Sequence, residues 1–139
     1  MKRIVFVGAL LAALCPQVQA QHEGWIKLLL SSTDIDIYYQ PLSIDERPDG
    51  TRYVASLLNY TDKNGRPASI ITSRVFDCQR QTKMDLSNVQ YGQHWGDGEV
   101  VAASGKESEW REVSPGSNGA TLLTATCSDT PAKSTQLHR

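Results

Sequence analysis

The stretch RYVASLLNY, residues 52–60, decides the fold of this 139-residue chain. Its side chains alternate as they do in a β-strand, with Val54 and Leu58 on one face and Tyr53 and Leu57 on the other. A strand with one wet face carries polar groups on that face, whereas here both faces carry apolar groups. This stretch is therefore predicted to lie in the middle of a sheet.

Further strand-like stretches lie on both sides of residues 52–60. The apolar side chains of residues 34–40 alternate onto one face, and residues 70–78 are rich in β-branched residues. Shorter candidate strands are residues 25–31, 84–91 and 99–103. Glycine-containing turns separate the strands at residues 48–50, 62–65 and 92–98, and the last of these is expected to be a flexible loop.

The C-terminal part leaves two interpretations open. A helix beginning near Ala120 is one, because Ser117 or Asn118 can cap it. A strand is the other, because the threonines within residues 121–126 are β-branched. Residues 128–139 are polar and without apolar periodicity, which predicts a disordered tail.

The first twenty residues predict a secretion signal peptide. Lys2 and Arg3 precede the apolar residues 4–14, and the Val-Gln-Ala sequence at residues 18–20 suits a signal peptidase. A buried N-terminal helix is the alternative, and these flanking residues argue against it. Cleavage after residue 20 would leave 119 residues with a net charge of −3.

The three cysteines bear on compartment and stability. Cys15 follows the apolar run, as the lipid-carrying cysteine of a lipoprotein does, but such signals want a very small residue where this chain has Leu14. Lipid anchoring is therefore disfavoured, and the mature protein is expected in the periplasm, at the cell surface or secreted. Cleavage leaves Cys78 and Cys127 in an oxidising compartment, where two thiols usually pair. The sequence predicts a structural disulfide between them and no zinc site.

Composition and motifs exclude several classes of protein. The chain is 40% hydrophobic and 21% charged with a net charge of −1, which is typical of a globular domain and lacks the basic excess of a nucleic-acid-binding protein. No apolar run reaches the length that spans a bilayer. The nucleophile elbow and the phosphate-binding glycine-rich loop are absent. The sequence predicts no enzyme, no cofactor and no metal.

The titratable residues give little support to catalysis. His22 and His138 lie near the two ends of the sequence, and only His94 lies within the predicted domain. Asp34 and Asp36 alternate onto one strand face, where water-facing acids are common. A surface position for His94 is favoured over a role as catalytic base, because no partner group is assigned to it.

The three tryptophans are more informative. Trp25 opens the first predicted strand and Trp110 precedes a Pro-Gly loop, so both are expected to anchor the core or the edge of the sheet. Trp95 lies among glycines beside His94. These two residues are candidate contacts for a protein partner, and the alternative is that Trp95 folds back over a sheet edge.

An ordered set of residues runs from Trp25 to Cys127 and resembles a known family. It comprises Trp25, Tyr38 with Pro41-Leu42-Ser43-Ile44, Ser73 with Asp77-Cys78 and Arg80, Trp110-Arg111-Glu112-Val113-Ser114-Pro115-Gly116-Ser117, and Cys127. This order resembles the surface-adhesin protein E family of Gram-negative bacteria. The resemblance implies an α+β fold with a single antiparallel sheet of about six strands. It also implies a C-terminal helix over residues 120–127, tied to the sheet by the Cys78–Cys127 disulfide.

The resemblance implies a function as well. The best-known family member is a surface lipoprotein that binds host extracellular-matrix and plasma proteins and can dimerise. The expectation is a signal peptide at residues 1–20, a surface-adhesin-E-like domain at 21–127 and a tail at 128–139. The domain is expected to be a non-catalytic binding module of the bacterial envelope, with a protein partner and no integral membrane span. The alternative is a periplasmic structural or assembly protein that dimerises or binds an internal envelope partner. No binding residue is carried over from the family, because none of its binding segments is recognisable here as a motif.

Overall fold

The computed structural model describes residues 23–30, 34–62, 64 and 66–128. The predicted signal peptide lies outside these residues, as do residues 129–139 of the predicted tail. The strands are β1 (Ile26–Lys27), β2 (Ile35–Tyr39), β3 (Asp45–Glu46), β4 (Arg52–Tyr60), β5 (Ser69–Asp77), β6 (Thr82–Tyr91), β7 (Val100–Ser104) and β8 (Arg111–Glu112). The helical segments are the 3₁₀ turns η2 (Pro41–Ser43) and η3 (His94–Gly96) and the α-helix α1 (Asn118–Ser128). Ser128 is thus the last residue of α1 rather than the first residue of a tail.

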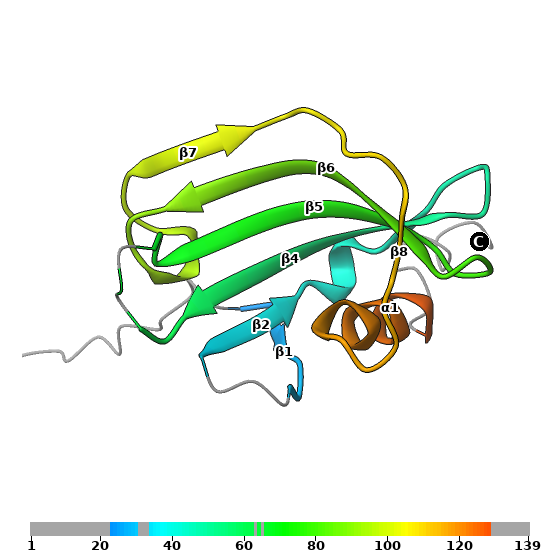
Figure 1. Cartoon of the computed structure of the whole chain (residues 1–139), viewed down its shortest axis with the longest axis horizontal. Coiled ribbons are helices and arrows are strands. Elements are labelled where there is room, and N and C mark those ends of the chain that lie inside the picture. Colours follow the sequence, from blue (N-terminus) through cyan, green and yellow to red (C-terminus); the bar gives the residue numbers. More distant parts are fainter. Residues whose placement is uncertain (1–22, 31–33, 63, 65, 129–139) are drawn as a thin grey trace, which may run out of the picture.

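All the described strands join one antiparallel sheet, which α1 covers at one end (Figure 1). Six strands follow the order β1-β2-β4-β5-β6-β7, while β3 pairs with β4 and β8 pairs with β6. The predicted antiparallel sheet of about six strands is therefore confirmed, with two short strands in addition. β4 lies between β2 and β5, which confirms the central position predicted from its two apolar faces.

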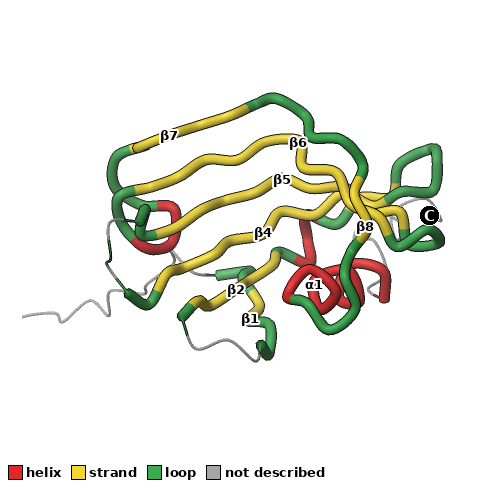
Figure 2. The backbone as a smooth tube through the Cα atoms, in the orientation of Figure 1, coloured by secondary structure: helices red, strands yellow, loops and turns green. Residues whose placement is uncertain are grey.

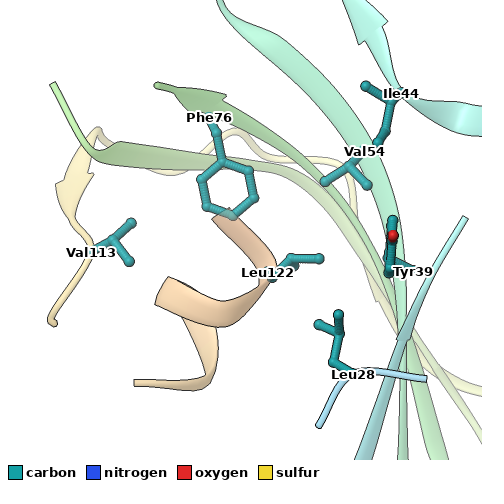
Figure 3. Close-up of a cluster of buried hydrophobic side chains, with 7 residues drawn as sticks. All are labelled: Leu28, Tyr39, Ile44, Val54, Phe76, Val113 and Leu122. Atoms are coloured by element: carbon teal, nitrogen blue, oxygen red, sulfur yellow. The ribbon is translucent and has the colours of Figure 1, made fainter. Parts of the chain in front are cut away.

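The core lies between the helix and the face of the sheet that Val54 and Phe76 share. Both side chains are completely buried, and they form one cluster with Leu122 of α1 (Figure 3). The other members of this cluster are Leu28, Tyr39, Ile44 and Val113. Leu57 and Val75, which alternate onto the opposite face, are also completely buried. Burial on both faces explains why β4 and β5 have no continuous polar side.

The C-terminal segment is a helix, which settles the choice between helix and strand. The hydroxyl of Thr126 donates to the carbonyl of Leu122 at 2.8 Å, and that of Thr124 donates to the carbonyl of Ala120 at 3.0 Å. These bonds satisfy the β-branched threonines inside the helix, where Leu122 also becomes buried against the sheet. The Oγ of Ser117 accepts a hydrogen bond from the N–H of Ala120 at 3.2 Å and so caps the first turn.

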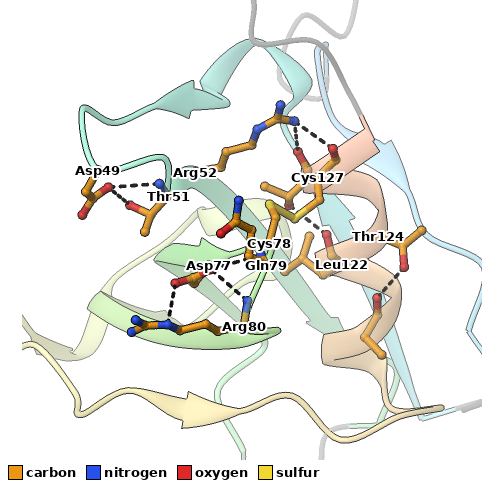
Figure 4. Close-up of a disulfide and its surroundings, with 12 residues drawn as sticks. Asp49, Thr51, Arg52, Asp77, Cys78, Gln79, Arg80, Leu122, Thr124 and Cys127 are labelled. Atoms are coloured by element: carbon orange, nitrogen blue, oxygen red, sulfur yellow. Dashed lines mark hydrogen bonds and ion pairs between the residues drawn. A yellow bond between two sulfur atoms is a disulfide. The ribbon is translucent and has the colours of Figure 1, made fainter.

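Two attachments hold the C-terminal end of α1 against the sheet (Figure 4). The predicted disulfide joins Cys78, directly after β5, to Cys127, with their Cα atoms 5.9 Å apart. Beside it, Nη1 of Arg52 donates to the carbonyl oxygens of Thr126 and Cys127 at 3.1 and 2.9 Å. A helix end leaves its last carbonyls without intrahelical partners, so Arg52 satisfies two of them.

Candidate functional site

The turn η3 lies at the end of the long strands opposite to α1 (Figure 2). Two buried polar residues, Asn59 and Ser69, are register partners on β4 and β5 and hold this turn down. The Oδ1 of Asn59 accepts a hydrogen bond from the N–H of Trp95 at 2.9 Å, and the Oγ of Ser69 accepts one from the N–H of Gly96 at 2.9 Å. The Ser69 hydroxyl donates in turn to the carbonyl of Gln93 at 2.6 Å. The predicted flexible loop is therefore a hydrogen-bonded turn seated on the sheet.

Trp95 folds back onto the sheet. Its ring centroid lies 4.6 Å from that of Tyr38 on β2, with an interplanar angle of 51°, and the residue is half-buried. Its backbone φ is +67°, a conformation that bulky residues rarely adopt. Of the two interpretations from the sequence, the geometry matches the one in which Trp95 covers the sheet, and its ring positions the turn. The neighbouring His94 is exposed, and its Nε2 lies 2.7 Å from the carbonyl oxygen of Tyr60.

Gly96→Ala tests whether this turn depends on close packing. Gly96 has a φ of +72°, and an added Cβ would lie 2.6 Å from Cδ1 of Ile71. We expect the free energy of unfolding to fall by about 1–3 kcal/mol. Gly50→Ala changes the backbone cost alone, since its φ is +83° and nothing lies within 4 Å of the added atom. Gly105→Ala, with open space, is the neutral control. Urea denaturation should show the largest loss in the free energy of unfolding for Gly96→Ala, a smaller one for Gly50→Ala and the smallest for Gly105→Ala. Equal losses for Gly96→Ala and Gly50→Ala would show that close packing against Ile71 contributes nothing.

A hollow of about 660 Å³ lies beside η3, between the β4–β5 and β6–β7 connections, and is called the Asp62 hollow below. Its polar lining comprises Asp62, Arg66, Gln90, Gln93 and His94, and its apolar lining comprises Pro67, Ala68 and Val101. The Oδ2 of Asp62 accepts a hydrogen bond from Nδ2 of Asn64 at 2.9 Å. The Oδ1 of Asp62 is buried and has no hydrogen-bond partner among the described residues. The volume lies within the range of ligand pockets.

A second feature, at the α1 end of the sheet, is a group of cations around one carboxylate. Asp85 forms ion pairs with Arg74 and with Arg111, the latter at 3.5 Å. The ammonium of Lys83 lies nearby, 3.5 Å from the position a Cβ would take on Gly119. The pKa of Lys83 is lowered from its ordinary value of 10.5, mainly by partial burial and secondly by the like charge of Arg74.

Lys83→Met tests the sign of this effect. A lysine whose pKa is lowered by folding is destabilising while it is charged, and the penalty disappears as the pH rises through the folded-state pKa towards 10.5. The variant should therefore be more stable than the wild type near pH 7, and the difference should shrink near pH 10. Lys27→Met is the control of opposite sign, because a hydrogen bond to Asp36 raises the pKa of Lys27. Urea denaturation at the two pH values measures both, and a constant difference for Lys83→Met would contradict the assignment.

The other residues singled out in the sequence are not among those that line the Asp62 hollow. Trp25 is half-buried and directly precedes the edge strand β1. Trp110 is 44% exposed and directly precedes β8, whose two exposed residues pair with β6. A core position is therefore excluded, and its role as an anchor at the edge of the sheet stays a prediction. Asp36 pairs with Lys27 at 2.8 Å rather than forming a carboxylate pair with Asp34. His22 and His138 lie outside the described residues.

The sequence did not point to Asn59, to Ser69 or, apart from His94, to the residues that line the Asp62 hollow. One signal was present, since a central strand with apolar faces carries buried polar residues only where they have partners. Over residues 23–30, 34–62, 64 and 66–128, no group of three or more histidine, cysteine, aspartate or glutamate residues is placed to hold a metal ion. In the same part of the chain, no helix is long and apolar enough to cross a bilayer.

The family match covers the whole of this sheet and helix. The surface-adhesin protein E family matches residues 25–128, from Trp25 to the last residue of α1. The chain belongs to this family. Membership in the surface-adhesin protein E family supports an adhesin-like surface protein and a non-enzymatic role. No curated protein sequence matches the chain.

Solved structures of protein E from Haemophilus influenzae share the fold. Crystal form II of that protein is 16% identical, with a TM-score of 0.60 over 76% of this chain and 88% of that chain. Protein E from non-typeable Haemophilus influenzae is also 16% identical, with a TM-score of 0.55 over 76% of each chain. At this identity the likeness concerns the fold alone, and it confirms the fold class expected from the resemblance.

Proposed function

We propose that the chain is an exported, non-catalytic binding module of the bacterial envelope that attaches to host extracellular-matrix or plasma proteins. Membership in the surface-adhesin protein E family over residues 25–128 carries this proposal. The arrangement of the fold supports it, because the disulfide and the core lie at the α1 end of the sheet while the Asp62 hollow lies at the opposite end. A hollow with polar and apolar lining, held by a rigid sheet, suits recognition of a protein surface.

The proposal is tested by measuring how many cells that express the full chain are retained on a surface coated with vitronectin or laminin. Retention above that of cells without the gene, together with protease-accessible protein at the surface, is the expected result. Ala68→Phe fills the Asp62 hollow and should lower retention at least about fivefold if this region makes the contact. Ala103→Phe adds the same ring at an exposed position outside the hollow and should leave retention unchanged. Purely periplasmic protein that ignores both ligands would contradict an adhesive role.

A second candidate function is a periplasmic assembly protein that dimerises, and strand β7 favours it. All five residues of β7 are exposed, and among the described strands it pairs only with β6. Val100 and Val101 are 57% and 50% exposed on this edge. An exposed apolar edge strand is a template for pairing with another chain. Light scattering of the purified protein at high concentration tests this: a dimer that Val101→Lys converts to monomer supports it, and a strict monomer contradicts it.

A further inference from the structure

The Asp62 hollow has a chemical character that points to one kind of ligand. The free Oδ1 of Asp62 is a buried carboxylate oxygen without a donor among the described residues. A buried acceptor left unsatisfied costs roughly 1–3 kcal/mol, and more when it is charged. The χ2 torsion of aspartate is broad, so the carboxylate can turn an oxygen into the hollow that it lines. A donor in the hollow would then recover this cost on binding.

The number of Asp62 carboxylate oxygens without a hydrogen bond distinguishes between arginine and lysine as the side chain that the hollow binds. Arginine binds carboxylates best through two parallel N–H bonds to both oxygens. Here Asn64 already donates to one oxygen of Asp62, which leaves a single oxygen. A lysine ammonium is a point donor with three N–H groups, and it matches one oxygen together with neighbouring neutral acceptors. Gln90 and Gln93 line the same hollow, and a glutamine carries a neutral side-chain acceptor of this kind.

The rest of the lining fits the lysine stem. Lysine carries four methylene groups, which bury against apolar surface while the charged end reaches a polar group. Pro67, Ala68 and Val101 provide that surface. The opposing feature is Arg66, a cation among the described lining residues, whose guanidinium lies 5.3 Å from the centre of the Tyr60 ring. This cation–π contact keeps Arg66 on the aromatic face, yet its charge still repels a second cation.

On these grounds we propose that the Asp62 hollow binds a lysine side chain displayed on the surface of a partner protein. Asp62 accepts from the ammonium, Gln90 and Gln93 complete its acceptors, and Val101 packs against the stem. The inference deepens the proposed function, because it rests on a protein partner and names the group that is recognised.

Chemical-shift titration of the full chain, expressed with its own N-terminus, tests this with capped tripeptides. The backbone amides of Gly92, Gln93 and His94 should shift with Ac-Gly-Lys-Gly-NH₂, with a dissociation constant on the order of 1 mM. The matched peptide with norleucine has the same stem without the charge and should not bind. The peptides with arginine and with glutamate are the remaining comparisons, and both should bind more weakly than the lysine peptide.

Two variants with opposite expected effects separate a change in charge from a general disturbance of the β4–β5 connection. Asp62→Asn should weaken lysine binding about tenfold, whereas Arg66→Gln should strengthen it about two- to threefold by removing the like charge. Asp97→Asn changes a carboxylate of the neighbouring β6–β7 connection that does not line the hollow, and it should leave lysine binding unchanged. A purely structural role for Asp62 would not predict opposite signs for the two charges.

Several results would overturn the inference. These are no lysine-dependent shift, equal binding of the norleucine or arginine peptide, or glutamate binding that depends on Arg66. Lysine binding without retention on matrix proteins would leave the hollow assigned and refute the adhesive function. Retention on matrix proteins that persists in Asp62→Asn, together with no lysine binding, would support the adhesive function and refute lysine binding in the hollow.

Discussion

Replacing both Cys78 and Cys127 by serine should lower the free energy of unfolding by about 4 kcal/mol. The bond closes a loop with a sequence separation of 49, and cross-linking a loop of that length removes this much chain entropy from the unfolded state. It also holds the last turn of α1 beside the sheet, where the carbonyls of Thr126 and Cys127 accept from Arg52. The variant should therefore lose helix and sheet together in one transition. Urea denaturation followed by circular dichroism measures the loss.

Reduction of the wild type provides the matched control. Dithiothreitol should lower the stability of the wild type to about that of the double variant and should leave the double variant unchanged. A wild type that is indifferent to the reductant, with both cysteines titrating as free thiols, would show that the bond does not form. A variant that loses less than about 1 kcal/mol would show that α1 is held by packing alone.

The second large effect is expected from Phe76→Ala, with a loss of about 3–5 kcal/mol. Phe76 is completely buried on β5 and belongs to the same cluster as Leu122 of α1 (Figure 3). Truncation removes the ring and leaves a cavity between sheet and helix that the surrounding backbone can only partly close. Leu42→Ala is the control, since Leu42 is 79% exposed and its loss should stay within about 0.5 kcal/mol.

A double-mutant cycle with Leu122→Ala sharpens this prediction. Because both side chains line the space that truncation would open, their combined loss should be smaller than the sum of the single losses. Additive losses would indicate that the ring and the helix occupy separate parts of the core. Equilibrium urea denaturation of the four proteins provides the measurement.

Much of the fold follows from local pattern. Residues 52–60 are predicted as a strand and form β4 with the same bounds, because the alternation of side chains and the burial of both faces agree. The two-residue strands β3 and β8 carry no such pattern, since they exist only where the chain passes close to β4 and β6. The helix remained ambiguous from local pattern because β-branched threonines favour a strand, and tertiary burial of Leu122 and Thr126 decides against that preference.

The candidate site could be predicted only in part. His94 was singled out as an isolated residue and does line the Asp62 hollow. Asp62 lies far in the sequence from Gln90 and Val101, and it comes close to them because β4 pairs with β5, β5 with β6 and β6 with β7. No single stretch of sequence encodes that arrangement. Trp95 was correctly placed in the loop between β6 and β7, but its contact with Tyr38 depends on β2, which is far away in sequence. Pairing across strands, rather than composition, assembles this region.

The cross-link and the Asp62 hollow lie at opposite ends of the long strands, and this separation has an evolutionary consequence. On the lysine binding proposed above, exchanging Gln90, Gln93 or Val101 for another side chain alters what the hollow binds without touching the disulfide or the buried core cluster. A lineage could thus acquire a new binding target by a few substitutions at the end of the sheet that carries the Asp62 hollow, while the end that carries the disulfide stays unchanged.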